Sequence, residues 1–385
     1  MIMRNIIFVS EICASKDKTN STHILTSGLI EGLAQTGHNL IFIAICETSE
    51  EPYLEEKYGQ LVDKLIFARR YCSTTAGKYK RLLQLYRYML FGLPIKKQIY
   101  PQLAEYINEE TILISHSPSV ESVFFCKKIK NKYPAIRYIQ YWSDPLALSG
   151  ILPEQVGIKR LPFKWLENFC YSKATEVVYG TKTLMDFQAT LFQKHQNKMR
   201  YVDWGYIPKG EKPNKKATEQ KLNVVYSGNY YSSIRNILPL YNAMDKLDYD
   251  ICLNVYGLSD LTLKNTKNVY IHERISAEKI QEIEWNADIL VALMNTNCIQ
   301  IPGKTFYNID INQHILVILD GKYKEQLREY LETFHRFAFC ENNEESIKQA
   351  ILALSKTDYS IDWDSIEKLS PKNIALELIS ENFVN

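Results

Sequence analysis

Short apolar runs alternate with amphipathic stretches along the first half of the chain. Residues 5–9 form a β-branched apolar run, which is typical of a buried parallel strand. After a polar loop, apolar residues recur at helical spacing from 23 to about 38, and a second apolar run fills 40–45. The alternation continues with strands expected at 111–115, 137–142 and 177–180 and a helix near 119–131. Strands that alternate with helices predict a parallel sheet covered on both faces.

The pattern breaks once and then restarts. Residues 208–222 are polar and basic and carry two prolines and a glycine, so we expect a linker. Beyond it, strands are expected at 223–227, 251–257, 269–272, 288–293 and 315–319, with helices near 234–246 and 276–286. The fold class is therefore α/β, with two Rossmann-like doubly wound domains, residues 1–207 and 223–363. The segment from about 364 to 385 is helical in pattern and could pack back on the first domain.

Composition excludes several classes of protein. The 46 basic and 44 acidic residues leave a formal charge of +2, so charge gives no reason to expect nucleic acid as a partner. The eight cysteines form no CxxC and no Cys/His cluster, which indicates a reducing compartment and no zinc site. No stretch approaches the roughly 18 apolar residues of a membrane span. We expect a cytoplasmic protein that needs no metal.

Two loops of the second domain carry candidate chemistry, because ligands of parallel sheets bind beyond the carboxyl ends of the strands. Ser227-Gly228-Asn229 follows one strand, and Arg235 is expected early in the next helix, where it could contact phosphate. A plain βα turn with a surface arginine fits this segment equally well. In the second loop, Lys304 follows Pro302-Gly303 before a short helix. It could bind phosphate or carboxylate, or it could be an ordinary solvated lysine, which is the commoner case.

These stretches, with Asn286-Ala287-Asp288 and Pro302-Gly303-Lys304, resemble the second half of the GT-B glycosyltransferases of the family-4-like group. The first half resembles the same family, including Gly37-His38 before the second strand. The resemblance covers most of the chain. It implies two domains that face each other across a cleft, and a nucleoside-diphosphate sugar as donor substrate.

The resemblance also implies roles for residues of the second domain. Gly228, Asn229, Arg235 and Lys304 would hold the donor diphosphate, whose developing charge cationic side chains and amides stabilise without a metal or other cofactor. Thr305 and Tyr307 complete the expected donor site, with Tyr307 at a position where the family usually has a ribose-binding glutamate.

In the first domain, His116 and Asp144 follow two predicted strands and are the candidate catalytic residues, although turn or cap roles are common for such residues. The acceptor side is assigned to Asn20 and Ser21, in the loop that replaces the family's Gly-Gly pair, and to Tyr179, which could line the cleft. His23 is expected on the surface.

Residues 78–91 are basic and strongly apolar, with interleaved aromatic side chains. They predict an amphipathic helix that either lies on an anionic membrane or packs on the first domain with its lysines reaching solvent. The membrane interpretation would make the protein peripheral on the inner face of the cell membrane.

The expected function is transfer of a sugar to a glycan or lipid-linked glycan acceptor in surface polysaccharide biosynthesis, with retention and without metal. The alternative is an inactive GT-B-like binding or partner subunit. Tyr307, Asn312 and His314 depart from the family pattern and keep that alternative open. A nicotinamide oxidoreductase is disfavoured, because no GxGxxG follows the first strand.

Overall fold

The computed structural model describes residues 3–12, 21–69, 99–117, 120–147, 161–208, 221–247, 250–296 and 300–381. The chain forms two compact units. Unit 1 comprises residues 1–205 and 371–385, and unit 2 comprises residues 206–370. The predicted membrane helix at 78–91 and most of the predicted linker lie outside the described residues.

Unit 1 is built on a parallel sheet. Its described strands lie in the order β3-β2-β1-β4-β5-β6-β7, so the strand order reverses between β1 and β4. The central strands β1 and β2 are buried because their apolar runs are covered on both faces. The bounds are β1 Asn5–Glu11, β2 Asn39–Cys46, β3 Lys64–Arg69, β4 Ile112–Ser117, β5 Arg137–Trp142, β6 Glu176–Tyr179 and β7 Met199–Tyr201.

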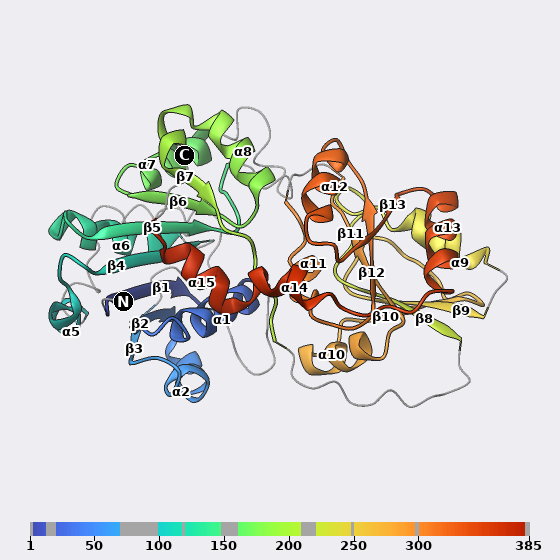
Figure 1. Cartoon of the computed structure of the whole chain (residues 1–385), viewed down its shortest axis with the longest axis horizontal. Helices are drawn as coiled ribbons and strands as arrows, with labels where there is room; N and C mark the ends of the chain where they lie inside the picture. Colours follow the sequence, from blue (N-terminus) through green and yellow to red (C-terminus); the bar gives the residue numbers. More distant parts are fainter. Residues whose placement is uncertain are drawn as a thin grey trace. The chain divides into compact units, whose positions relative to one another are not determined.

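The helices of unit 1 are labelled in Figure 1. They are α1 Ser21–Ala34, α2 Glu51–Tyr58, α5 Tyr100–Leu103, α6 Val120–Lys132, α7 Leu161–Tyr171, α8 Lys182–Leu191 and α15 Pro371–Ile379. Short 3₁₀ turns span Thr48–Glu50, Ala104–Tyr106 and Gln193–Lys198. The expectation that His23 lies on the surface is wrong. His23 is buried, because Lys57 of α2 lies over it, with Nζ 3.1 Å from His23 Nε2.

The last helix, α15, lies beside α1 (Figure 1), and beyond it Glu381 pairs with Arg4 near the start of the chain at 2.5 Å. The approach is close at Gly32, where a Cβ atom would lie 2.1 Å from the carbonyl oxygen of Pro371. Only a glycine at this position of α1 leaves room for the start of α15.

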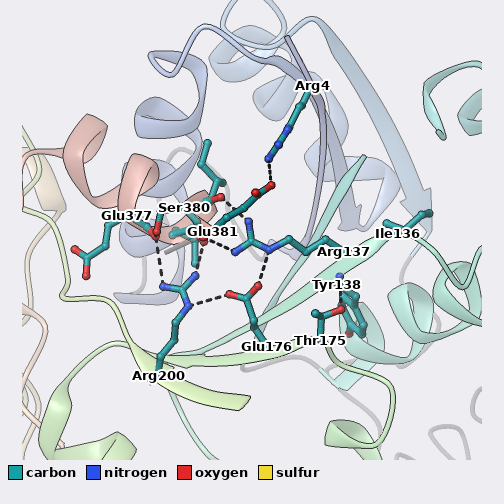
Figure 2. Close-up of polar contacts among 12 residues, drawn as sticks. Arg4, Ile136, Arg137, Tyr138, Thr175, Glu176, Arg200, Glu377, Ser380 and Glu381 are labelled. Atoms are coloured by element: carbon teal, nitrogen blue, oxygen red, sulfur yellow. Dashed lines mark hydrogen bonds and ion pairs between the residues drawn. The ribbon is translucent and has the colours of Figure 1, made fainter. Parts of the chain in front are cut away.

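The carboxyl end of α15 is held by two arginines from the sheet (Figure 2). Arg137 donates to the carbonyl oxygens of Ile379 at 2.6 Å and Ser380 at 2.5 Å, and Arg200 donates to that of Leu378 at 2.6 Å. Glu176 lies between the arginines and accepts from Arg137 Nε at 2.5 Å and from Arg200 Nε at 2.9 Å. The last carbonyls of a helix have no partner within it, so the arginines cap α15.

Unit 2 has its own parallel sheet, whose described strands lie in the order β10-β9-β8-β11-β12-β13. The predicted α/β class with two parallel sheets is confirmed. The strands are β8 Leu222–Ser227, β9 Ile251–Tyr256, β10 Val269–His272, β11 Ile289–Leu293, β12 His314–Leu319 and β13 Ala338–Glu341. The helices are α9 Leu238–Asp245, α10 Ala277–Trp285, α11 Lys304–Tyr307, α12 Lys324–Glu332, α13 Glu344–Leu354 and α14 Trp363–Ile366, followed by a 3₁₀ turn at Glu367–Leu369.

Helix α9 starts later than predicted. The expected helix over 234–246 begins at Leu238, and Pro239 occupies its first turn. Proline has no N–H to donate to the carbonyl of Arg235, so the helix cannot extend continuously back to that residue. The prediction that Arg235 lies early in the helix is therefore wrong: it lies in the loop between β8 and α9.

Within the part of the chain that the structure describes, none of the helices combines the length and the apolar character needed to cross a membrane.

Candidate functional site

The candidate site of unit 2 lies where the strand order of its sheet reverses. Strands β8 and β11 are neighbours there, and the chain continues from β8 to β9 on one side and from β11 to β12 on the other. In open parallel sheets this reversal leaves a crevice at the carboxyl ends of the strands, where ligands bind. Ser227 ends β8 at this edge, Gly228 and Asn229 follow it, and Asn295 comes after β11.

The turn after β8 is hydrogen-bonded to the end of β9 and the turn that follows it. Gly228 N donates to the carbonyl oxygen of Tyr256 at 2.9 Å, and Asn229 Oδ1 accepts from Leu258 N at 3.0 Å. Gly257 has a φ of +151°, and a Cβ atom there would lie 2.1 Å from the carbonyl oxygen of Gly228. This edge is therefore shaped by backbone contacts that require glycine.

Arg235 is held over this turn by two hydrogen bonds. Its Nε donates to Asn295 Oδ1 at 2.6 Å, and its Nη1 donates to the carbonyl oxygen of Asn229 at 3.1 Å. The half-buried guanidinium is thus held in place by both the β8 turn and the residue that follows β11.

Lys304 approaches the same turn from α11. Its Nζ donates to Ser227 Oγ at 2.8 Å and to Glu284 Oε1 at 2.8 Å, and Ser227 Oγ donates to the same carboxylate oxygen at 2.5 Å. Glu284 is only 3% exposed, whereas the lysine side chain is 40% exposed. The ammonium group therefore combines a buried counter-ion with access to solvent.

The structure thus brings Arg235, from the loop after β8, and Lys304, from α11 after β11, to one three-residue segment, Ser227–Asn229. An arginine and a lysine at the carboxyl edge of a parallel sheet match the needs of a phosphate group, which charge-assisted hydrogen bonds recognise.

Thr305 and Tyr307 do not share this exposure. Both side chains are buried in unit 2, and Thr305 Oγ1 has no hydrogen-bond partner among the described residues. The expectation that they contact a donor directly does not fit this arrangement, because α11 turns them toward the core.

In unit 1, His116 lies where the strand order reverses between β1 and β4. Its Nδ1 is 3.2 Å from Ser10 Oγ and 3.0 Å from Thr26 Oγ1, and its Nε2 has no partner among the described residues. Burial lowers the pKa of His116 to about 3, so the ring is neutral at physiological pH. The expectation that His116 faces an open cleft is wrong, because the rings of Phe8 and Tyr141 help to enclose it.

Asp144 follows β5 and is half-buried, and its Oδ2 accepts from Ser143 Oγ at 3.3 Å. The loop that carries Asp144 is held by a buried side chain: Oε2 of Glu167 accepts a hydrogen bond from the amide of Ala147 at 2.7 Å. The structure therefore places Asp144 at the carboxyl edge of the sheet, in a loop that Glu167 holds in place.

Tyr179 is part of the buried hydrogen-bond network around Glu167 and does not lie at the surface. Its hydroxyl donates to Tyr171 at 2.9 Å, and Tyr171 donates in turn to Glu167. Tyr179 is fully buried, so the expectation that it lines an acceptor site is wrong. Of the other two acceptor-side residues, Asn20 lies outside the described residues and Ser21 begins α1.

Sequence reasoning missed Glu284 and Asn295, which hold the two cationic side chains. One signal was present for Glu284: it is an acidic residue in the last turn of the predicted helix 276–286, where the helix dipole favours basic residues. An acidic residue in that position indicates a compensating partner. Asn295 carried no comparable signal, since polar residues after a strand are common.

The chain is similar in structure to several solved proteins. No protein-family model matches the sequence, and no curated protein matches it. One similar solved structure is the lipopolysaccharide outer core galactosyltransferase WaaB, with 13% identity, a TM-score of 0.61, and 98% of this chain and 100% of that chain covered. A second is sucrose-phosphate synthase from Thermosynechococcus elongatus, with 12% identity, a TM-score of 0.59, and 97% and 94% of the two chains covered. A third is UDP-GlcNAc 2-epimerase from Methanocaldococcus jannaschii, with 11% identity, a TM-score of 0.54, and 97% and 99% covered.

The chain has the GT-B fold. The resemblance seen in the sequence is thereby confirmed at the level of the fold. Identities of this size carry no more than the fold, and transferases and an epimerase both have it. The reaction must therefore be argued from the site.

Proposed function

We propose that this protein is a glycosyltransferase that moves a sugar from a nucleoside-diphosphate sugar to a glycan or lipid-linked glycan. The observation that carries the proposal is the convergence of Arg235 and Lys304 on the Ser227–Asn229 turn of unit 2. In support, two of the solved structures with this fold are named as a galactosyltransferase and a sucrose-phosphate synthase.

The chemistry of transfer suits this pair of side chains. As the bond between sugar and diphosphate breaks, negative charge grows on the leaving phosphate. Fixed cations at that position lower the free energy of the transition state more than that of the bound donor. We propose that Arg235 and Lys304 perform this role, together with the amides of Gly228 and Asn229. We further propose that the reaction needs no metal and retains the configuration of the sugar.

The acceptor side is proposed to lie in unit 1. Asp144 is the candidate for accepting the proton of the acceptor hydroxyl, since it is half-buried at a strand end. For His116 a direct role requires a rearrangement that exposes the ring, because it is fully buried in this conformation.

The first experiment is a thermal-shift screen against UDP, GDP, ADP and CMP sugars, followed by donor hydrolysis without acceptor. Binding with slow hydrolysis is expected. Binding without turnover, also with a panel of glycan acceptors, would favour an inactive GT-B-like subunit. Activity that EDTA abolishes and Mg²⁺ or Mn²⁺ restores would contradict the metal-free proposal.

The second experiment tests the cationic pair. Arg235→Ala and Lys304→Ala should each weaken nucleoside-diphosphate binding by about 1.5–3 kcal/mol, the range of a hydrogen bond to a charged group. Lys246→Ala is the matched control, because Lys246 also pairs with a glutamate, Glu344, but is well exposed. Equal effects of the three substitutions would remove the support for a phosphate site.

A further inference from the structure

Glu284 stands out in unit 2 as a buried acid in an unfavourable place. It is the penultimate residue of α10, where the partial negative charge of the helix end opposes a carboxylate. Lys304 Nζ at 2.8 Å and Ser227 Oγ at 2.5 Å both donate to Oε1 and help to offset this cost. The same lysine is the proposed phosphate ligand, so one ammonium group serves a buried carboxylate and a ligand.

The geometry limits how far a bound phosphate can lie from this carboxylate. A phosphate oxygen that accepts from Lys304 Nζ at about 2.8 Å lies no more than about 5.6 Å from Glu284 Oε1, since Nζ is itself 2.8 Å from that oxygen. Glu284 is almost fully buried, so solvent screens this repulsion weakly. Negative charge on the phosphate that Lys304 binds is therefore opposed at short range.

We propose that Glu284 is a counter-ion that weakens binding of the free nucleoside diphosphate more than binding of its sugar ester, and so favours release of the product. This inference rests on the proposed function. Loss of the sugar turns a phosphodiester into a terminal phosphate whose second ionisation lies near pH 6. At pH 8 the product carries about one more negative charge than the donor, so the repulsion from Glu284 is larger for the product.

The test is isothermal titration at pH 8 with UDP, GDP and ADP and with the glucose ester of each. The wild-type protein is compared with Glu284→Gln, which keeps the shape of the side chain and removes its charge. For the pair that the wild type binds, we expect the substitution to tighten the ester about tenfold and the diphosphate about thirtyfold. The ratio of the two dissociation constants then changes about threefold.

Two variants separate charge from structure. Glu284→Asp keeps the charge and should keep the wild-type ratio even if both affinities change. Glu344→Gln removes an exposed carboxylate from the equivalent pair with Lys246 and should change neither affinity. Melting temperatures show whether each variant folds; if Glu284→Gln does not, Glu284→Met, which also removes the charge, takes its place.

The outcomes are distinct. If Glu284 only holds Lys304 in place, Glu284→Gln weakens diphosphate and ester by the same factor, and the counter-ion role is overturned. An unchanged ratio overturns it as well, while the proposed function stands, because the wild type still binds its ligands. Failure of the wild type to bind any of the pairs contradicts the proposed function and this inference with it.

Discussion

Replacing Glu176 by glutamine should destabilise unit 1 and weaken the capping of its last helix. Glu176 is 1% exposed and gives one carboxylate oxygen to each of two arginines, whose side chains are 16% exposed. Burial lowers the pKa of Arg200, and the nearby carboxylate acts in the opposite direction. Removing the charge therefore leaves Arg137 and Arg200 close together with no shared counter-ion.

The expected cost is about 3 kcal/mol, at the lower end of the roughly 3–5 kcal/mol for removing one partner of a buried ion pair. The lower end applies because glutamine keeps one acceptor and the arginines keep their bonds to the carbonyl oxygens of α15. For a unit of this size each kcal/mol shifts the melting temperature by about 2–4 °C, so Tm should fall by about 6–12 °C.

Two measurements check this prediction: thermal unfolding, and hydrogen exchange of peptides that cover 371–381. Exchange should accelerate in those peptides, since the arginines that cap α15 lose their anchor. Lys182→Met is the matched control. It breaks an exposed pair with Asp186, and such pairs contribute about 0–1 kcal/mol. If Glu176→Gln melts with the control and its C-terminal peptides stay protected, the reasoning about the buried cluster is refuted.

Three further predictions address other parts of the chain. Burial lowers the pKa of His116 to about 3 and that of His23 to about 4, below the value of about 6.5 in the unfolded chain, so the folded protein disfavours protonation of both rings. As the pH falls from above 6.5 to 5, each histidine should therefore lower the free energy of unfolding by about 2 kcal/mol. The urea midpoint measured against pH checks this, and a flat profile would contradict it. Gly257→Ala should destabilise unit 2 by about 1–3 kcal/mol, because the new Cβ meets the Gly228 carbonyl at a φ of +151°, and an unchanged melt would contradict this. Glutamate at positions 78, 80 and 81 should release the protein from anionic liposomes without lowering Tm, and failure of the wild type to bind them in low salt would leave 78–91 as a packed helix.

Much of the fold followed from periodicity alone. The runs at 5–9 and 40–45 are the buried strands β1 and β2, because short apolar runs with β-branched residues favour a strand covered on both faces. Strands that mix polar and apolar residues were not predicted. Examples are β3, with its exposed Lys64 and Arg69, and the three-residue β7. Edge strands are half-exposed, so their apolar signal is weak.

The site was predictable only in part. Parallel topology places the residues after β8 and β11 at one edge, which is why Arg235 and Lys304 could be expected near each other. Burial could not be anticipated. His116 and Tyr179 stand at strand ends like Asp144, but neighbouring aromatic rings or hydrogen-bonded tyrosines enclose them, and such contacts are made between residues distant in sequence.

Unit 1 contains residues from both sides of unit 2 in the chain, and this has a consequence for biosynthesis. Residues 206–370 must be translated before α15 exists, which takes about 8–33 s at roughly 5–20 residues per second. During that interval the face of α1 around Gly32 is bare, and Arg137 and Arg200 have no carbonyls to cap. The nascent chain can complete unit 2 first, although unit 1 begins earlier, and the N-terminal sheet acquires its last helix only as synthesis reaches residues 371–381.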